Sequence, residues 1–223
     1  MKARLISVSK PTRKMYDDGV VDAQDLISFC ARVSNPSNQL NLGTAEGLIR
    51  YLAKHKHWSP FEMVSACIEV ETTRDIARQL LRHRSFSFQE FSQRYADPTK
   101  DLEFVYREAR LQDQKNRQNS INTDDKKLQD DWLNVQKRIA DMCKKEYEWA
   151  IQQGIAKEQA RALLPEGLMM SRLYVNGTIR SWIHYIELRS GNGTQKEHIE
   201  VAKACAQAIV EAFPMISEYV QEC

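Results

Sequence analysis

Residues 82–95, Arg-His-Arg-Ser-Phe-Ser-Phe-Gln-Glu-Phe-Ser-Gln-Arg-Tyr, form the most informative stretch of the chain. Three consecutive basic side chains are followed by a polar run that contains a single carboxylate, Glu90. Ionised groups are costly to remove from water unless they are paired, so this stretch does not suit a core. Arg82 and Arg84 carry planar guanidinium groups that suit phosphate or carboxylate. The stretch therefore predicts an anion-binding site with small polar groups around a ligand.

The same block resembles the signature of the flavin-dependent thymidylate synthases, which make dTMP from dUMP using FAD, methylenetetrahydrofolate and NADPH. That signature reads Arg-His-Arg-x-x-Ser-x-(Asn/Gln)-Glu-x-Ser-x-Arg-Tyr. The residues that match it are Arg82, His83, Arg84, Ser87, Glu90, Ser92, Arg94 and Tyr95, with Gln89 where Asn is commoner. The resemblance implies this reductive methylation for the chain. It also implies FAD as cofactor, with the folate as carbon donor and NADPH as reductant.

In and just before the block, the resemblance implies two overlapping sets of ligand contacts. Those expected at FAD are Arg82, His83, Arg84 and Glu90. Those expected at the substrate dUMP are Gln79, Arg82, Glu90, Phe91, Ser92, Gln93 and Arg94. Gln79 and Arg82 are three residues apart and are expected on one helix. The sequence offers no partnered base for Ser92, so we assign this serine to substrate binding rather than to nucleophilic attack.

Two shorter segments resemble other elements of the same family. Residues 57–62, His-Trp-Ser-Pro-Phe-Glu, match an element whose hydroxyl contacts the flavin and whose histidine lies on the folate and NADPH side. This implies flavin contact by Ser59 and a place for His57 on the other side. Arg161, in Ala-Arg-Ala-Leu-Leu-Pro, matches an arginine that binds the nucleotide. Many members carry a histidine where this chain has Met63, so no role is carried over to that position.

Residues 176–189 form the second strong match, to a helix that ends in an essential arginine. The resemblance places Arg189 at the uracil ring as the catalytic residue, and it places three residues at FAD: Thr178, Arg180 and His184. By helical geometry Arg180 and His184 share a face, whereas Arg189 lies about 140° further round. Two ligands approached from two faces fit that arrangement. Gly193 stands where some relatives carry a histidine near the flavin.

Composition and charge restrict the remaining possibilities. The formal net charge of +2 gives no global attraction to nucleic acid, and no apolar run approaches the roughly 20 residues that span a bilayer. We therefore expect neither a nucleic-acid partner nor a membrane, and a cytoplasmic location. Five cysteines lie far apart without a Cys-x-x-Cys pair, so no metal site is expected. Those in helix-like patterns are expected to be small core residues: Cys30, Cys143 and Cys205.

Hydrophobic periodicity predicts strands and helices in a mixed order. Strands are expected at 3–9 and 63–71, the second with one apolar face made of Val64, Ala66, Ile68 and Val70. Thr44 is expected to cap one helix. Thr72 and Asp75 are expected to form a capping pair for another helix, which runs to about Arg84. Further helices are expected at 22–33, 131–154, 158–164, 178–189 and 195–213. The apolar face of the first is expected to be Leu26, Phe29, Cys30 and Val33, and that of the second Trp132, Val135, Ile139 and Met142.

These elements predict an α/β (α+β) fold, with residues 1–223 as one domain whose small sheet is flanked by several long helices. A polar insertion at about 107–131 is expected to be a solvated excursion or a mobile loop. The resemblance alone implies a homotetramer with active sites shared between subunits. In such an assembly, residues of the 82–95 and 176–189 blocks meet across an interface.

Two other classes of function stay open on the residues alone. Arginines interleaved with Phe86, Phe88, Phe91 and Tyr95 are also typical of an RNA-binding surface, although the near-neutral charge weighs against it. Five histidines suggest a metal hydrolase, but their spacing lacks the His-Glu-x-x-His pattern. Yellow protein that bleaches with NADPH supports the flavoenzyme. Salt-sensitive RNA retention supports the RNA-binding alternative, and loss of activity with a chelator supports the metal enzyme.

Overall fold

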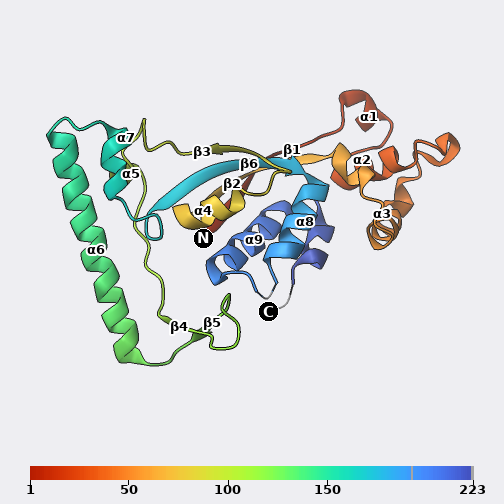
Figure 1. Ribbon diagram of the computed structural model, residues 1–223. Helices are drawn as coiled ribbons and strands as arrows, with labels where there is room; N and C mark the ends of the chain where they lie inside the picture. The colour runs from red at the N-terminus through yellow and green to blue at the C-terminus, as the bar shows by residue number, and fades with distance from the viewer. Residues whose placement is uncertain (192, 222–223) are drawn as a thin grey trace.

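The computed structural model describes residues 1–191 and 193–221, and an antiparallel sheet lies at its centre (Figure 1). The strand order is β1-β2-β6-β3, and each neighbouring pair is antiparallel. The strands are β1 (Lys2–Val8), β2 (Ser65–Thr73), β3 (Ser87–Glu90) and β6 (Met170–Thr178). A separate two-stranded hairpin joins β4 (Arg110–Gln112) to β5 (Ser120–Asn122).

One face of the sheet is apolar and packed, and the other is polar. Along β2 the side chains of Ala66, Ile68 and Val70 are buried, and the intervening residues are partly exposed. Helices α4 (Arg74–Leu80), α8 (Ile179–Arg189) and α9 (Lys196–Ile209) contact the sheet and share its apolar core (Figure 1). The opposite face carries cross-strand ion pairs such as Arg172–Glu71, at 2.6 Å. This alternation confirms the predicted mixed α/β class, with a small sheet covered on one side.

Helices account for most of the remaining chain. The α-helices are α1 (Arg13–Asp17), α2 (Ala23–Ala31), α3 (Ala45–Lys54), α4 (Arg74–Leu80), α5 (Pro98–Asp101), α6 (Lys126–Gln152), α7 (Lys157–Ala160), α8 (Ile179–Arg189) and α9 (Lys196–Ile209). The 3-10 helices are η1 (Pro36–Asn38), η2 (Leu42–Thr44), η3 (Ser59–Met63), η4 (Arg161–Leu163) and η5 (Pro214–Tyr219). Among the described helices, none combines the length and apolar character needed to cross a bilayer.

The segment before the 82–95 block differs from the prediction in its boundaries. The N-cap of α4 is Thr73 rather than Thr72, and its hydroxyl donates to the Asp75 carboxylate at 2.6 Å instead of capping a backbone amide. The helix ends at Leu80 rather than near Arg84, so Gln79 lies on it and Arg82 lies beyond it. The chain then forms β3, a short polar strand that periodicity did not predict because only Phe88 in it is apolar.

Two N-terminal helices were predicted with the wrong apolar face or cap. In α2 the buried side chains are Ala23, Ile27 and Ser28, whereas Val33 is 69% exposed and lies beyond the helix. Thr44 precedes α3, but its side chain does not cap the helix. The Thr44 hydroxyl instead accepts a hydrogen bond from Arg32 Nη2 at 2.6 Å. Competition from a buried arginine therefore overrides the capping preference at this position.

The polar insertion is more regular than predicted. Strands β4 and β5 form a hairpin within it, and α6 begins at Lys126 behind an Asp125 cap, five residues earlier than expected. Gln136 of α6 exchanges hydrogen bonds with the backbone of Arg107, which anchors the segment. Most residues of the segment are exposed, as expected of a solvated excursion, but the hairpin and the first turn of α6 give it regular structure that the sequence did not predict. Gly154, with φ +80°, follows the end of α6 as predicted.

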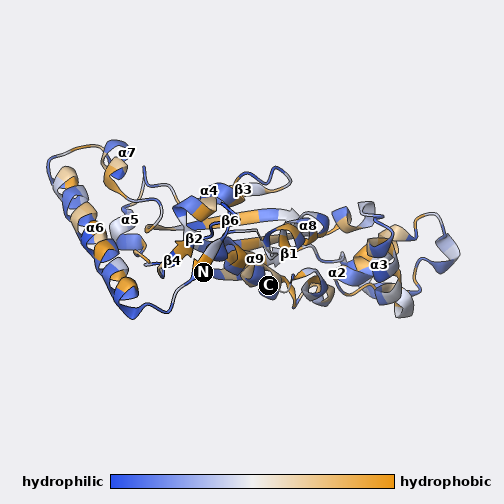
Figure 2. Ribbon diagram, turned by 60° about the horizontal axis from the view of Figure 1, so that its bottom comes forward, coloured by the Kyte–Doolittle hydropathy of each residue, from blue (hydrophilic) through white to orange (hydrophobic). Residues whose placement is uncertain are grey.

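The apolar stripe of α6 does not pack on its own chain. Trp132 is 41% exposed and Met142 is 58% exposed, whereas the buried residues of this helix are Gln136, Ala140, Tyr147 and Ala150. Figure 1 shows α6 lying apart from the sheet, and Figure 2 shows apolar residues along it. Cys205 is buried as predicted, whereas Cys30 and Cys143 are partly exposed. Cys223 lies outside the described residues.

Candidate functional site

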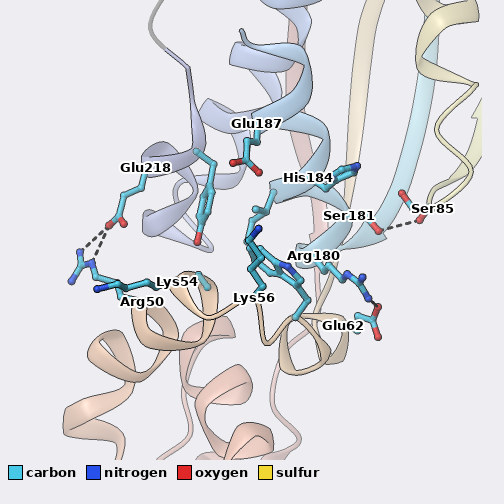
Figure 3. Close-up of a pocket in the computed structure, with 14 residues that line it drawn as sticks. Arg50, Lys54, Lys56, Glu62, Ser85, Arg180, Ser181, His184, Glu187 and Glu218 are labelled. Atoms are coloured by element: carbon cyan, nitrogen blue, oxygen red, sulfur yellow. Dashed lines mark hydrogen bonds and ion pairs between the residues drawn. The ribbon is translucent and has the colours of Figure 1, made fainter.

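A cavity of about 880 Å³ lies between α3, η3, η5 and one face of α8 (Figure 3). Its lining residues are Arg50, Ala53, Lys54, Lys56, Trp58, Glu62, Ser85, Arg180, Ser181, Ile183, His184, Glu187, Glu218 and Tyr219. Small-molecule sites in proteins commonly occupy roughly 300–1,000 Å³. The cavity is therefore large enough for an extended ligand, and it combines apolar walls with cationic side chains.

The charges around the cavity are only partly neutralised. Arg50 donates to the Glu218 carboxylate at 2.8 Å, and Arg180 is paired with Glu62 (Figure 3). Across residues 1–191 and 193–221, neither Lys54 nor Lys56 has a carboxylate within salt-bridge distance. Set against the carboxylate of Glu187, which also lines the cavity outside the described ion pairs, the two lysines leave an excess of positive charge that favours an anionic ligand group.

Lys56 has a backbone conformation that normally favours glycine. Its φ is +59°, and it follows the C-cap residue of α3. The amide of Lys56 donates to the Ala53 carbonyl at 3.0 Å, and that of His57 donates to Leu52 at 2.8 Å. These two bonds form a Schellman motif, in which glycine is the usual residue at the position of Lys56. A lysine side chain is therefore held at a strained position on the cavity wall.

Arg189 is held by a histidine rather than by a carboxylate. Its Nε–H donates to His83 Nε2 at 3.1 Å, and no described acidic residue is within salt-bridge distance of its guanidinium group. Burial and the nearby Arg189 charge lower the pKa of His83 to about 4. The imidazole is therefore neutral and accepts the bond, so the positive charge of Arg189 is oriented but not neutralised.

The residues of α8 point to two sides, as helical spacing predicted. Arg180 and His184 line the cavity, whereas Arg189 turns toward His83. Thr178 is the N-cap of α8, and its hydroxyl accepts from the Ser181 amide at 3.2 Å. In the structure Thr178 therefore has a capping contact that the sequence did not predict. The Ser181 hydroxyl donates to the Ser85 carbonyl at 3.3 Å, which fixes the turn after Arg84 against the helix.

A close backbone approach also holds this turn in place. A Cβ atom on Gly177 would lie 2.3 Å from the Phe86 ring, so only glycine admits Phe86 at this position. Phe86 is 8% exposed and packs on Trp182, with ring centroids 4.5 Å apart. The two other predicted cavity-side residues, His57 and Ser59, are exposed near the lining residue Trp58. Arg82 and Arg84 are likewise exposed.

The other predicted residues gather at the opposite end of β3. The Glu90 carboxylate accepts from Ser171 Oγ at 2.9 Å and from Arg74 Nη1 at 3.3 Å. Arg94 pairs with Glu158 of α7 at 3.0 Å. The remaining predicted members here are half-buried Phe91 and Ser92, buried Gln93, and exposed Arg161 in η4.

One buried polar atom at this end lacks a partner. Gln93 is 3% exposed, and its side-chain Nε2 has no hydrogen-bond partner among the described residues. Buried amide donors are usually satisfied, because leaving one unpaired costs about 1–3 kcal/mol. The Gln93 amide therefore carries an unmet hydrogen bond inside its own chain, which marks the loop after β3 as locally unfavourable.

A single chain does not bring the two predicted groups together. The Phe91 amide donates to the Arg172 carbonyl, whereas α8 begins after Thr178. Seven residues of strand separate Ser171 from Thr178, or about 23 Å at 3.3 Å per residue. Neither Arg94 nor Arg189 lines the cavity of about 880 Å³. That the two blocks meet across an interface between copies of the chain stays a prediction.

Sequence reasoning missed several cavity residues. Lys54 and Lys56 alternate with two histidines in the run Lys-His-Lys-His (54–57), which was a readable basic signal beside the Trp-Ser-Pro-Phe-Glu element. Glu218 was not predictable, because η5 returns to the cavity from the far end of the chain. Buried His198 was also missed, since it sits within an ordinary helical pattern.

The structure does not favour either alternative class of site. Three of the four aromatic rings that would stack on RNA are buried or half-buried, and only Tyr95 is strongly exposed. Within residues 1–191 and 193–221, no three His, Cys, Asp or Glu side chains form a group that could hold a metal ion.

Comparisons with known proteins agree with the geometry. The family model described as "Thymidylate synthase complementing protein" matches residues 18–215. The chain is 49% identical over 218 residues to the "Probable flavin-dependent thymidylate synthase" of Paramecium bursaria Chlorella virus 1, covering 98% of each. It is 44% identical to the flavin-dependent thymidylate synthase of Synechocystis sp., covering 97% of this chain and 98% of that protein. A solved structure of the UMP/dUMP methylase PolB from Streptomyces cacaoi, bound with 5-Br dUMP, matches with a TM-score of 0.77 at 26% identity, covering 98% of this chain and 93% of that one.

Proposed function

Since the chain belongs to the flavin-dependent thymidylate synthases, we propose that it catalyses the reductive methylation of dUMP to dTMP. In this proposal methylenetetrahydrofolate donates the carbon, and NADPH reduces the bound FAD. The names of its relatives support a flavin and a methyl-transferring enzyme. The 5-Br dUMP of the PolB structure supports a pyrimidine nucleotide as substrate.

The cavity on α8 fits a flavin. Its volume of about 880 Å³ and its mixture of apolar and cationic walls suit an extended, anionic cofactor. Arg180, His184 and Ser59 are proposed to hold the flavin, with Lys54 and Lys56 placed for its phosphates or for an anionic co-substrate. When bound, FAD supplies the hydride that the methyl group requires. His57 is proposed to lie on the folate and NADPH side, and the segment Arg82–His83–Arg84 is proposed to complete the flavin site.

The observation that carries the proposed role of Arg189 is its bond to His83. A neutral imidazole fixes the guanidinium group at 3.1 Å without cancelling its charge. The C5 carbon of uracil is a poor nucleophile, and attack requires negative charge to build up on the ring. A fixed cation beside that ring stabilises this charge, which lowers the barrier. We therefore assign Arg189 as the catalytic residue and His83 as the group that orients it.

The remaining substrate contacts are proposed to come from a second copy of the chain. Arg161 and residues 90–94 carry the hydroxyl, amide and guanidinium groups that suit a nucleotide phosphate. They lie about 23 Å along β6 from the start of α8, and we infer that a second copy offers them to a nucleotide held by Arg189.

The exposed stripe of α6 supports the same assembly. Apolar side chains recur at alternating steps of four and three residues through Leu128, Trp132, Val135, Ile139 and Met142. This period of 3.5 residues is typical of a seam between packed helices. Contiguous exposed apolar surface of this kind marks an interaction site in soluble proteins. We propose that it packs in a homotetramer whose active sites are shared between subunits.

The function is tested by mixing dUMP with the folate and the NADPH-reduced flavoprotein under anaerobic conditions. We expect dUMP-dependent oxidation of the flavin and one dTMP for each flavin oxidised. Flavin oxidation that does not depend on dUMP, with no dTMP formed, would contradict the proposed function.

The role of Arg189 is tested in the same assay. In Arg189→Ala, turnover is expected to fall about a hundredfold or more, because one preorganised electrostatic group is removed. Flavin content is expected to stay close to the wild-type value, since Arg189 does not line the cavity. Equal turnover in the variant would exclude Arg189 from the chemistry.

A further inference from the structure

A series of buried and half-buried hydrogen bonds includes Gln79 and ends close to the histidine that binds Arg189. His198 is fully buried, and its two ring nitrogens lie 3.1 Å from the Tyr185 hydroxyl and 3.2 Å from Gln79 Oε1. Gln79 Nε2 donates to Gln195 Oε1 at 3.0 Å. Gln195 Nε2 then donates to the Glu197 carboxylate at 2.9 Å. The series links α4, α8 and α9, which meet below the sheet.

The Glu197 end of this hydrogen-bond series determines which group donates and which accepts in each bond. Arg110 of the β4–β5 hairpin donates to the other oxygen of Glu197, and the two side chains are only 12% and 9% exposed. Burial acts to raise the pKa of Glu197, but hydrogen bonds from Arg110, the backbone and Gln195 outweigh it, so the pKa is lowered. The carboxylate is therefore ionised and can only accept hydrogen bonds.

An acceptor at one end determines every donor that follows. Glu197 requires the NH2 group of Gln195 to face it, so the Gln195 oxygen must face Gln79. The NH2 group of Gln79 then points to Gln195, and its oxygen requires a proton on His198 Nδ1. His198 Nε2 is left as an acceptor for the Tyr185 hydroxyl. All four bonds are consistent with this single direction.

The other end of the hydrogen-bond series, at Tyr185, lies against His83, the histidine that binds Arg189. The Tyr185 ring meets His83 edge-on, with centroids 5.0 Å apart and an interplanar angle of 89°. His83 in turn accepts from Arg189 Nε. The hydrogen bonds therefore hold the side-chain amide of Gln79 in one orientation, and they fix Tyr185, whose ring packs against the histidine that binds Arg189.

We propose that this one-way relay, from Tyr185 through His198, Gln79 and Gln195 to Glu197, positions Arg189 and Gln79 for the nucleotide. Arg110 anchors its end, so the polar hairpin contributes a positioning residue to the site. This inference rests on the proposed function, which assigns Gln79 and Arg189 to the substrate. It gives the 107–131 insertion a role in the reaction, because Arg110 belongs to it.

Replacing Glu197 tests the relay in the full-length, flavin-loaded protein. Glu197→Gln keeps the size of the side chain but adds a donor, so the direction of the relay is no longer imposed. We expect kcat/KM for dUMP to fall roughly ten- to a hundredfold, as for other small misplacements of reacting groups. Arg110→Gln is expected to lose a similar factor and Arg110→Lys to recover part of it. Flavin content is expected to stay unchanged in all three.

Lys203→Gln is the matched control. Lys203 is exposed on the same helix, α9, and it is not part of the relay or of the ion pairs around Arg110. Its replacement is expected to keep wild-type kinetics. If Glu197→Gln and Arg110→Gln also keep wild-type kcat/KM, the relay does not position the site.

The proton on His198 gives a readout that does not depend on activity. Solid-state 15N NMR of histidine-labelled protein is expected to show His198 as the neutral Nδ1–H tautomer, assigned by its loss in His198→Asn. In Glu197→Gln this tautomer is expected to give way to a mixture. A proton on Nε2 in the wild type would overturn the relay, whether or not the enzyme is active. An inactive wild type with the Nδ1–H tautomer would instead overturn the proposed function.

Discussion

At the scale of single residues, Lys56 combines backbone strain with a place on the cavity wall. A left-handed conformation costs an ordinary residue about 1–2 kcal/mol, and glycine would avoid that cost. Lys56 nevertheless occupies the glycine position after α3, and its charge faces the proposed flavin site without a described carboxylate partner. Strain of this kind is often retained where a side chain is needed for binding.

Replacing Lys56 is therefore expected to separate stability from binding. Lys56→Gly is expected to raise the free energy of unfolding of the flavin-free protein by about 0.5–1 kcal/mol, because relief of strain outweighs the larger chain entropy of glycine. The same variant is expected to bind FAD severalfold more weakly. Denaturant titration and flavin fluorescence measure the two effects. Lys56→Arg, which keeps the charge and the strain, is the control, and tighter FAD binding by Lys56→Gly would refute this role.

The burial of His198 is expected to make the free energy of unfolding depend on pH. Burial and the nearby Arg189 lower the pKa of His198 in the folded protein to about 3, below the usual value of 6.5. Between these values the unfolded chain binds a proton that the folded chain rejects. The free energy of unfolding therefore falls as the pH drops below 6.5, by up to about 1.4 kcal/mol per pH unit from this residue. Above pH 7 the residue adds nothing to the slope.

The measurement is denaturant unfolding at several pH values from 4.5 to 8. His198→Asn is expected to show a shallower fall below pH 6.5 than the wild type, with matching slopes above pH 7. Identical slopes on the acid side would mean that His198 accepts a proton in the folded state.

At the scale of helices and strands, the sequence predicted best where apolar periodicity was long and packed within the same chain. Strand β2 and helix α8 lie close to their predicted bounds, because both bury alternating or helical sets of large apolar residues. Strand β3 and the hairpin were missed because they are short and polar, and a four-residue strand at a sheet edge has little periodicity to read. The helix cap at Thr73 was displaced by one residue for a similar reason, since two adjacent threonines are equivalent in pattern.

Helix α6 shows a different limit of sequence reasoning. Its apolar stripe was predicted as one face of a helix, but the rest of the chain covers that face only in part and leaves Trp132, Ile139 and Met142 exposed. Periodicity identifies an apolar face and does not say which chain covers it. The same limit applies to the site, because residue patterns identified both arginine-rich segments and could not show that a single copy keeps them apart.

Charges placed on that stripe are expected to break the assembly. In the double variant Ile139→Glu and Met142→Glu, light scattering is expected to report smaller particles than the wild type, and dTMP formation is expected to fall with them. Lys137→Glu, on the opposite face of α6, is the control and is expected to keep both the particle size and the activity. An active variant of reduced size would show that the shared site does not need this helix.

At the scale of the whole molecule, the fold places two binding groups at opposite ends of one sheet. The cavity proposed for the flavin adjoins the start of α8, where that helix leaves β6, and Arg189 lies at the other end of α8. The Ser92–Arg94 loop and Arg161 lie near the start of β6. In the proposed assembly, the sheet presents each half of the site to a different neighbour. Assembly would then control activity directly, since an isolated chain holds only half of each site.

Subunit complementation tests this arrangement most directly. Arg94→Ala and Arg189→Ala are each expected to be nearly inactive alone. The two variants carry different tags and are assembled together. Where they meet, one site combines both replaced residues, and the other site combines Arg189 of the first variant with Arg94 of the second. Purified hybrids are therefore predicted to regain dTMP formation, and to do so in proportion to their share of mixed interfaces. Hybrids that stay as inactive as the two parents would contradict a site built from two chains.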